Sequence, residues 1–365
     1  MNLTSKLDPR AVRYRTLAAL AALLTIGACN SDRLGPTTSD GTPIAAADPV
    51  ADTPTGTDAV GDSTPGAVDT SETLPTDTLS DAEVLASENQ PEAAFATASS
   101  RPGIAFGAFD LPDHLFNTTV YTGDVAASGP GDIISTLNKA RRVGARVVVR
   151  LSGSDAGFRN SNRTLNLAKW KAKIARFKKI NLKPYINDGT LIGHYILDEP
   201  HNSNTWKGQV PYATLEAMAK YSKSIWPGLT TVVRAYPDWL SKASFRWNYL
   251  DAAWAQYSGR KGEVKKWMKN QSAYAQREGL GLIVGLNVLN GGNKSSGIRG
   301  QQSGSYAMSA SQLRSWGGTL VSDPLACAFL NWKYSASYYN RSDIRSAMGY
   351  LANKAKTRSK KSCRI

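Results

Sequence analysis

The sequence has few of the residues that metal sites and nucleophilic sites usually need. It contains 3 His and 3 Cys in 365 residues, and none has the spacing of zinc ligands in HExxH or zinc-finger motifs. It also lacks a GxSxG nucleophile elbow, a dinucleotide-binding glycine fingerprint after an early strand, and a P-loop lysine beside its glycine cluster. These absences predict no metal and no cofactor, and they argue against a serine hydrolase.

The first 29 residues have the pattern of an export signal. Four cationic residues precede an apolar run, Leu17 to Ile26, which at about ten residues is too short to span a bilayer. The run ends in Ile26-Gly27-Ala28-Cys29, which resembles the lipobox of bacterial lipoproteins. This resemblance implies that Cys29 carries lipid and anchors the chain in the cell envelope. Asn30, in place of Asp, favours the outer membrane, on its periplasmic side or at the cell surface.

Residues 30–100 have a composition that opposes folding. They contain 13 Asp plus Glu against the single cation Arg33, a net charge of −12, and the first aromatic residue is Phe95. Such a segment buries too little apolar surface to offset its conformational entropy. We therefore expect residues 30–100 to form a disordered acidic tether.

Residues 101–365 reverse this charge balance. They contain 39 Lys plus Arg against 15 Asp plus Glu, or +24, together with all 9 Trp. The predicted helices around residues 169–179 and 261–269 are especially basic. Such runs are most often solvated outer faces, but they also suit an anionic glycan or lipopolysaccharide as partner. No nucleic-acid recognition motif accompanies them, so we expect no nucleic acid partner.

Short apolar runs alternate with helical patterns throughout residues 101–365. Eight of them are predicted as strands: Ile104–Phe109, Thr118–Tyr121, Arg146–Leu151, Ile192–Leu197, Thr230–Ala235, Ala252–Tyr257, Leu282–Val288 and Ala326–Trp332. Six intervening or final segments are predicted as helices: Asp132–Val143, Leu165–Ile180, Tyr212–Ile225, Lys261–Glu278, Ser309–Trp316 and Arg341–Ala355. Strands separated by helices favour a parallel sheet. The count of eight predicts an α/β fold of the (β/α)8 TIM-barrel type, with an open doubly wound sheet as the alternative.

The fourth predicted strand delivers two acids at its carboxyl end. In LIGHYILDEPH the apolar run is followed by Asp198, Glu199 and Pro200, and proline ends the ladder because it has no N–H. Residues at this end of barrel strands form the active sites of TIM barrels. Because neighbouring side chains on a strand alternate, we expect only one of the two acids, Glu199, to face the barrel mouth. The alternative is that both acids are structural or solvated.

The residues at the ends of the other predicted strands are mostly polar or aromatic. Aromatic faces stack on sugar rings, and amide, guanidinium and carboxylate groups bind hydroxyls. The alternative for the aromatic residues is that they cover the barrel core. The expected carbohydrate pocket contains Asp110, Arg150, Asp198, Glu199, His201, Tyr236, Asp238, Gln256, Tyr257, Asn287, Asn290, Trp332 and Tyr334.

The YILDEP pattern at the fourth strand resembles the acid/base end of the TIM-barrel glycoside hydrolases related to clan A. The resemblance implies that Glu199 is the general acid and that Asp198 takes the place of the usual Asn. These enzymes carry their nucleophilic Glu at the end of strand seven, where this chain has Asn287 and Asn290. An inverting scheme needs only a base about 6.5–9.5 Å from the acid, which Asp110 or Asp238 could supply. The alternative is a barrel that binds glycan without cleaving it.

Two cysteines remain once Cys29 is assigned to lipid. In an exported domain Cys327 and Cys363 could form a disulfide that ties the C-terminal segment to the last strand. The alternative is a buried free Cys327 and a frayed C-terminus.

Overall fold

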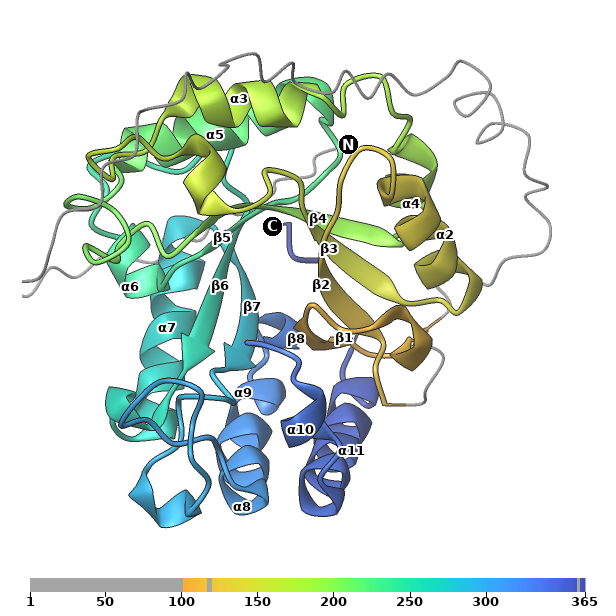
Figure 1. Ribbon diagram of the computed structural model, residues 1–365, viewed down its shortest axis with the longest axis vertical. Helices are drawn as coiled ribbons and strands as arrows, with labels where there is room; N and C mark the ends of the chain where they lie inside the picture. The colour runs from red at the N-terminus through yellow and green to blue at the C-terminus, as the bar shows by residue number, and fades with distance from the viewer. Residues whose placement is uncertain (1–100, 117–119, 360–361, 365) are drawn as a thin grey trace, which may run out of the picture. The chain divides into compact units, whose positions relative to one another are not determined.

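The computed structural model describes residues 101–116, 120–359 and 362–364. Eight parallel strands close into a barrel in chain order, with β1 paired to β8 (Figure 1). The (β/α)8 prediction is therefore confirmed. The strands are β1 (Ala105–Phe109), β2 (Gly123–Ala127), β3 (Arg146–Arg150), β4 (Leu191–Asp198), β5 (Thr231–Arg234), β6 (Ala252–Tyr257), β7 (Gly281–Leu286) and β8 (Ala326–Asn331).

Helices follow the strands and cover the outside of the barrel (Figure 1). Ser309 starts the helical segment after β7 with a capping box, its hydroxyl accepting the Gln312 N–H while the Gln312 side chain accepts the Ser309 N–H. The helices are α2 (Ile133–Arg142), α3 (Leu167–Ala175), α4 (Lys183–Asn187), α5 (Tyr212–Ile225), α6 (Pro237–Leu240), α7 (Val264–Glu278), α8 (Ala310–Gln312), the π-helical turn η7 (Leu313–Gly317), α9 (Gly318–Ser322), α10 (Ala336–Tyr339) and α11 (Ser342–Lys356).

The second strand lies further along the chain than the sequence predicts. Val120 and Tyr121, in the segment predicted as a strand, lie outside any strand, and β2 begins at Gly123. Gly and Asp have low strand propensity, but contacts within the barrel require Gly123 and Asp124 at the start of β2. A Cβ at Gly123 would lie 2.8 Å from the Ala105 Cβ, and Asp124 Oδ1 accepts the Leu111 N–H at 3.0 Å. Contacts with β1 and the segment after it therefore outweigh local propensity, and the prediction of Thr118–Tyr121 is wrong.

The barrel separates two apolar layers. Inside it, side chains such as Val148, Tyr195, Trp254 and Ile283 form a buried cluster. A larger cluster lies between the strands and the helices. His194 belongs to this outer layer, where its Nδ1 lies 2.8 Å from Ser222 Oγ. Strand alternation produces both layers from one sequence, because successive side chains point to opposite faces.

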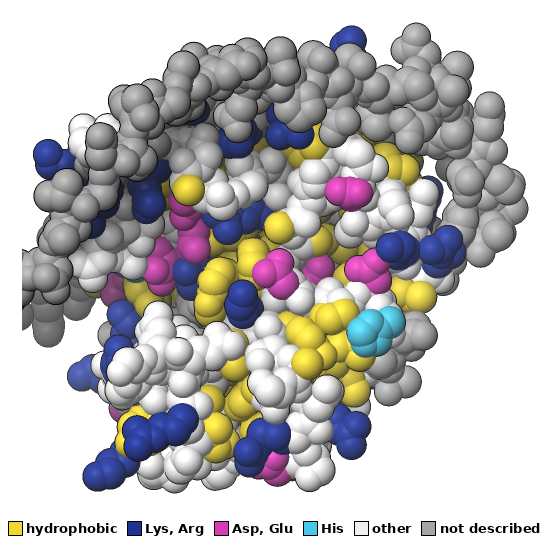
Figure 2. All heavy atoms as spheres, viewed as in Figure 1, with side chains coloured by type: hydrophobic (Ala, Val, Ile, Leu, Met, Phe, Trp, Pro, Cys, Tyr) yellow, Lys and Arg dark blue, Asp and Glu magenta, His cyan; other side chains and the backbone are white. Residues whose placement is uncertain are grey.

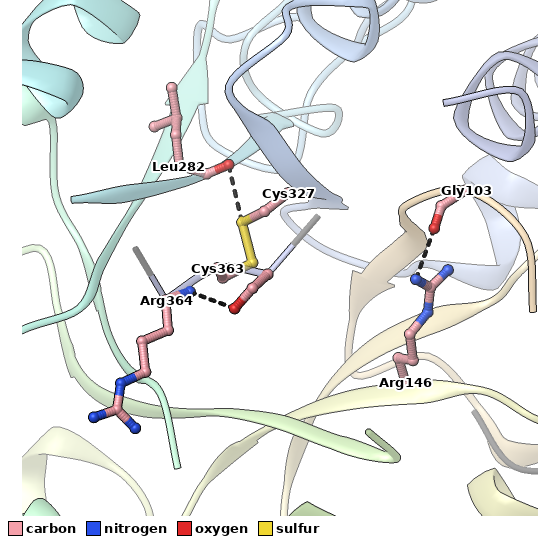
Figure 3. Close-up of a disulfide and its surroundings, with 7 residues drawn as sticks. Gly103, Arg146, Leu282, Cys327, Cys363 and Arg364 are labelled. Carbon is pink, nitrogen blue, oxygen red and sulfur yellow. Dashed lines mark hydrogen bonds between the residues drawn. A yellow bond between two sulfur atoms is a disulfide. The ribbon is translucent and has the colours of Figure 1, made fainter. Parts of the chain in front are cut away.

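A disulfide closes the amino-terminal end of the barrel. Cys327, the second residue of β8, is bonded to Cys363 (Figure 3), so of the two alternatives the structure has the bridge. Cys363 is buried and packs closely on the start of β7, since a Cβ at Gly281 would lie 2.2 Å from the Cys363 carbonyl oxygen. The segment 362–364 therefore contributes to the closed end of the barrel.

The predicted signal peptide, Cys29 and the acidic tether lie outside the described residues. Among the residues that are described, no helix is both long enough and apolar enough to cross a bilayer.

Candidate functional site

The carboxyl-terminal mouth of the barrel is organised around Arg234, the last residue of β5. Its guanidinium pairs with Asp198 through Nε and lies 3.3 Å from Glu199 Oε1 through Nη2. Nη1 donates to Gln256 Oε1 at 2.7 Å, and Cζ lies 4.3 Å from the centroid of Trp332. Trp332 follows β8, three strands along the barrel from β5. Arg234 thus reaches across the mouth and joins β4, β5 and β6 to the end of β8.

The two acids that end β4 both face this guanidinium. The expectation that only one of them faces the mouth is wrong, because the strand alternation stops at Asp198. Glu199 has a φ of 37°, which turns its side chain back toward Arg234, and its Oε2 accepts a hydrogen bond from Asn202 Nδ2 at 2.9 Å. The Glu199 side chain remains 31% exposed and that of Asp198 only 16%.

Asp198 is held as a carboxylate. Burial by itself would raise its pKa, but the Arg234 guanidinium, the Tyr195 hydroxyl and Arg150 together hold the pKa of Asp198 below its usual value. The pKa of Arg234 is raised in return: burial would lower it, but Asp198 and Glu199 outweigh that effect. The centre of the mouth is therefore a buried, ionised pair.

A second ion pair lies beside the first. Arg150, at the end of β3, donates through Nη2 to Asp155 Oδ1 at 2.6 Å, and its Cζ lies 5.7 Å from the Tyr195 ring centroid. Burial raises the pKa of Asp155 to about 6; the Arg150 charge opposes this rise and the Asp198 charge adds to it. The mouth therefore contains one carboxyl group that titrates near neutral pH.

His201 and Tyr236 form an aromatic wall next to Glu199. Their ring centroids are 5.0 Å apart, and Lys261 Nζ lies 4.2 Å from the Tyr236 centroid. Burial lowers the pKa of His201, although Glu199 opposes this shift. Burial, with a contribution from Glu199, raises the pKa of Tyr236 to about 12. Near neutral pH this wall presents a neutral imidazole and a protonated phenol.

The cavity at this wall is small and has unused hydrogen-bonding groups. Its volume is about 10 Å³, and it is lined by Glu199, His201, Arg234, Ala235, Tyr236, Trp254 and Gln256. Within the described ranges, neither His201 Nδ1 nor Gln256 Nε2 has a hydrogen-bond partner, although both atoms are buried. A cavity of this size holds about one water-sized group. Gln256 and His201 line this cavity together with Glu199, so it brings an amide, an imidazole and a carboxylate to one place.

Several predicted site residues lie away from this cavity. Gln256 points into the barrel, so its neighbour Tyr257 points outward, where its ring packs 5.2 Å from that of Trp267 and its hydroxyl donates to Gly262 O at 2.5 Å. Asp238, in α6, does not line the cavity, and its N–H donates to Gln271 Oε1 at 3.3 Å. Its carboxylate still contributes to the raised pKa of Tyr236. The Tyr334 ring packs at a tilt against that of Tyr339 in α10, with the ring centroids 5.1 Å apart.

The two asparagines after β7 shape the loop that follows. Asn290 Oδ1 accepts the Gln302 N–H at 2.8 Å and the Ser305 hydroxyl at 2.9 Å, and Asn287 Oδ1 accepts the Asn290 N–H at 3.2 Å. Asp110 directly follows β1 and is an exposed acid with a φ of 55°. Partial burial raises the pKa of Asp110, while the nearby Lys333 and Arg150 oppose the rise.

Four residues of the mouth were not predicted from the sequence: Arg234, Asp155, Tyr195 and Asn202. Arg234 could have been predicted, because it is a cation at the end of an apolar strand. Arg150 holds the same position in β3 and was predicted for that reason. No comparable pattern marked Asp155 and Asn202, since both lie in loops whose path is set by the barrel. No group of three or more His, Cys, Asp or Glu among the described residues is placed to hold a metal ion.

Comparison with known proteins supports the fold. No family model and no curated protein matches the chain. Among solved structures, the chain is similar to a β-glucanase from Saccharophagus degradans in complex with cellotetraose, with a TM-score of 0.51 at 11% identity over 72% of this chain and 93% of that one. The native form of that enzyme gives a TM-score of 0.52 at 10% identity, with the same coverage of both chains. At this identity the likeness shows the fold alone, a closed eight-stranded barrel like that of TIM-barrel glycoside hydrolases.

Proposed function

We propose that the mouth of this glycoside-hydrolase-like barrel binds a segment of an oligosaccharide or polysaccharide. The observation that carries the proposal is the pair of unused polar atoms, Gln256 Nε2 and His201 Nδ1, beside Glu199 in a cavity of about 10 Å³. Buried polar groups without partners are rare in folded proteins and indicate a missing partner. A sugar hydroxyl both donates and accepts hydrogen bonds, so it suits this set. The similarity to a β-glucanase solved with cellotetraose supports a carbohydrate ligand.

A glycan array followed by calorimetry on the hits tests this proposal. Gln256→Glu keeps the oxygen that accepts from Arg234 but replaces the unpaired amide donor with a second acceptor. We expect this change to weaken glycan binding by about tenfold or more, since one hydrogen bond of this kind contributes about 1.5 kcal/mol. Asn270→Asp, the same amide-to-carboxylate change on the exposed outer face of α7, is the matched control. Equal binding by both variants would place the glycan elsewhere.

Hydrolysis is the second candidate function, and backbone strain favours it. Of the three described non-glycine residues with positive φ, two are Asp110 and Glu199, the acids that follow β1 and β4. Strain of this kind costs about 1–3 kcal/mol and gathers at functional sites. A retaining scheme lacks its usual nucleophile because β7 is followed by Asn287, so the scheme we propose for cleavage is inverting, with Glu199 as acid and Asp110 as base.

Glu199→Gln separates cleavage from binding. The amide keeps the shape of Glu199 but cannot donate the carboxyl proton, so turnover on a bound glycan should fall by about 10²–10⁴-fold while binding and melting temperature change little. Asp110→Asn should reduce turnover similarly. If the wild-type protein binds glycan but releases no reducing sugar from any array hit, the barrel is a binding protein only.

We also propose that the domain is held at the cell envelope by lipid on Cys29. The support is the Ile26-Gly27-Ala28-Cys29 motif that ends the expected export signal. Metabolic labelling with a palmitate analogue should mark the wild type but not a Cys29→Ala variant. Surface protease accessibility then distinguishes the two faces of the outer membrane.

A basic groove supports the expectation of an anionic envelope partner. The groove between α7 and α11 has a volume of about 670 Å³ and is lined by four cations and one acid, together with the exposed Tyr350. The cations are Lys265, Lys269, Arg314 and Lys354, and the acid is Asp323. Figure 2 shows one face of the molecule, on which Lys and Arg side chains are dispersed and, near the middle, lie beside Asp and Glu side chains. Lys265→Glu with Lys269→Glu should reduce binding to lipopolysaccharide at low salt, and salt should weaken the wild-type interaction.

A further inference from the structure

Cations lie over three aromatic rings of the mouth. The pairs, with the distance from the cation to the ring centroid, are Arg150 over Tyr195 at 5.7 Å, Arg234 over Trp332 at 4.3 Å and Lys261 over Tyr236 at 4.2 Å. A cation in this position occupies the ring face on which the C–H surface of a neutral sugar would otherwise stack. These ring faces therefore offer charge to a ligand rather than an open stacking surface.

Of these three cations, only Lys261 lacks a carboxylate partner in the part of the chain that the structure describes. The other two form ion pairs, Arg150 with Asp155 and Arg234 with Asp198 and Glu199. The acid nearest to Lys261 in the sequence, Glu263, is engaged elsewhere, because its carboxylate accepts two N–H groups of the first turn of α7. Lys261 therefore brings to the mouth a positive charge that no described acid pairs with.

The Lys261 ammonium lies beside the small cavity of the mouth. Tyr236, the ring beneath it, lines that cavity. Burial lowers the pKa of His201 in the same wall, and the Lys261 charge adds to this effect. The turn that carries Lys261 is anchored at its end, since Gly262 O accepts the Tyr257 hydroxyl at 2.5 Å. Lys261 itself is exposed, so its charge is held at the cavity and remains accessible to a ligand.

We propose that Lys261 selects glycans that carry a carboxylate, and that the mouth binds a uronic acid residue with its carboxylate against the Lys261 ammonium. This inference rests on the proposed glycan binding and names the substrate class. An ammonium has three donors on a flexible side chain, so it can turn to meet a carboxylate. The Tyr236 ring already holds the cation in place, which reduces the entropy lost when a ligand binds.

Calorimetry with two matched pairs of oligosaccharides tests the proposal on the purified protein. The pairs are C6-oxidised cellotetraose with cellotetraose, and tetragalacturonate with its carboxyl-reduced form, so the members of a pair differ only in their carboxylates. We expect the wild type to bind the acidic member of at least one pair about three- to tenfold more tightly than the neutral member. High salt should reduce this preference, because it screens the exposed charge.

Three variants show whether Lys261 is the cause of the preference. Lys261→Met removes the charge but keeps an unbranched side chain, so it should abolish the preference while binding of the neutral member stays unchanged. Lys261→Arg keeps the charge and should retain most of the preference. Lys220→Met is the matched control, because Lys220 also lies over a tyrosine ring, that of Tyr249, but on the exposed face of α5.

The proposal would be overturned if the wild type showed no preference for the acidic member of either pair, or if Lys261→Met kept the wild-type preference. An equal loss of both members in Lys261→Met would also contradict it, since Lys261 would then support glycan binding without selecting a carboxylate. Failure of the proposed glycan binding is recognised separately, as an absence of binding to every glycan on the array. Array glycans whose binding Gln256→Glu weakens, but which show no preference for a carboxylate, would overturn this inference alone.

Discussion

Replacing Arg234 tests whether the barrel mouth depends on one buried cation. Arg234→Met keeps most of the apolar part of the side chain but removes the guanidinium. That group pairs with Asp198 and Glu199 and donates a hydrogen bond to Gln256. Asp198 is buried and ionised, so the variant leaves a carboxylate without its main counter-charge. Removing one partner of a buried pair typically costs about 3–5 kcal/mol. For a domain of this size that corresponds to a melting temperature lower by roughly 10 °C.

The pH dependence of the loss identifies its cause. The pKa of Asp198 is depressed in the folded protein, so its pair contributes stability above the unfolded-state pKa of about 3.9 and loses it as pH falls through the folded pKa. In Arg234→Met burial acts without the cation and raises the pKa of Asp198, so the variant gains stability as Asp198 takes up a proton between pH 7 and pH 4. The stability gap between wild type and variant should therefore be largest near pH 7 and narrow toward pH 4.

Urea unfolding followed by tryptophan fluorescence at the two pH values measures this gap. Arg345→Met, an exposed arginine on α11, is the control and should change stability by less than about 0.5 kcal/mol. Adding Asp198→Asn to Arg234→Met should recover part of the loss, because a neutral amide needs no counter-charge. A loss below about 1 kcal/mol at pH 7, or no recovery in the double variant, would refute the reasoning.

Four further changes have equally definite expectations. His194 is fully buried, and burial lowers its pKa to about 3. The neutral imidazole therefore supports folding above the unfolded-state pKa of about 6.5, and stability is lost as pH falls from 6.5 toward 3. His194→Gln should flatten the stability–pH curve in that window, measured by urea unfolding. Cys363→Ser opens a bridge that spans 36 residues and should cost about 3–4 kcal/mol, with intact mass of the wild type rising by about 2 Da on reduction; unchanged stability and mass would contradict the bridge. Gly107→Ala would place a Cβ 1.7 Å from the Gly123 carbonyl oxygen and should prevent a stable barrel, whereas Gly349→Ala in α11 meets no atom within 4 Å and should stabilise by about 0.5–1 kcal/mol in thermal unfolding.

The sequence alone determined the barrel and the position of its acids. Seven of the eight strands lie within two residues of their predicted bounds, and β6 matches at Ala252–Tyr257. These strands are buried on both faces, so their apolar runs are nearly continuous and easy to find. The position of Asp198 and Glu199 at the end of β4 was predictable for a similar reason. The apolar run ends at these acids, and Pro200, which has no N–H, cannot continue the strand.

Tertiary structure decided the features that depend on residues far apart in the chain. The local pattern at Gly123 opposes a strand, and only pairing with β1 and β3 makes it one. Arg234 and Trp332 meet because barrel closure brings the ends of β5 and β8 to one mouth. The same closure fixes which strand face is inner, and so assigns Gln256 to the site and Tyr257 to the outer layer. Sequence periodicity reports the alternation of side chains, but contacts across the barrel decide what each side chain meets.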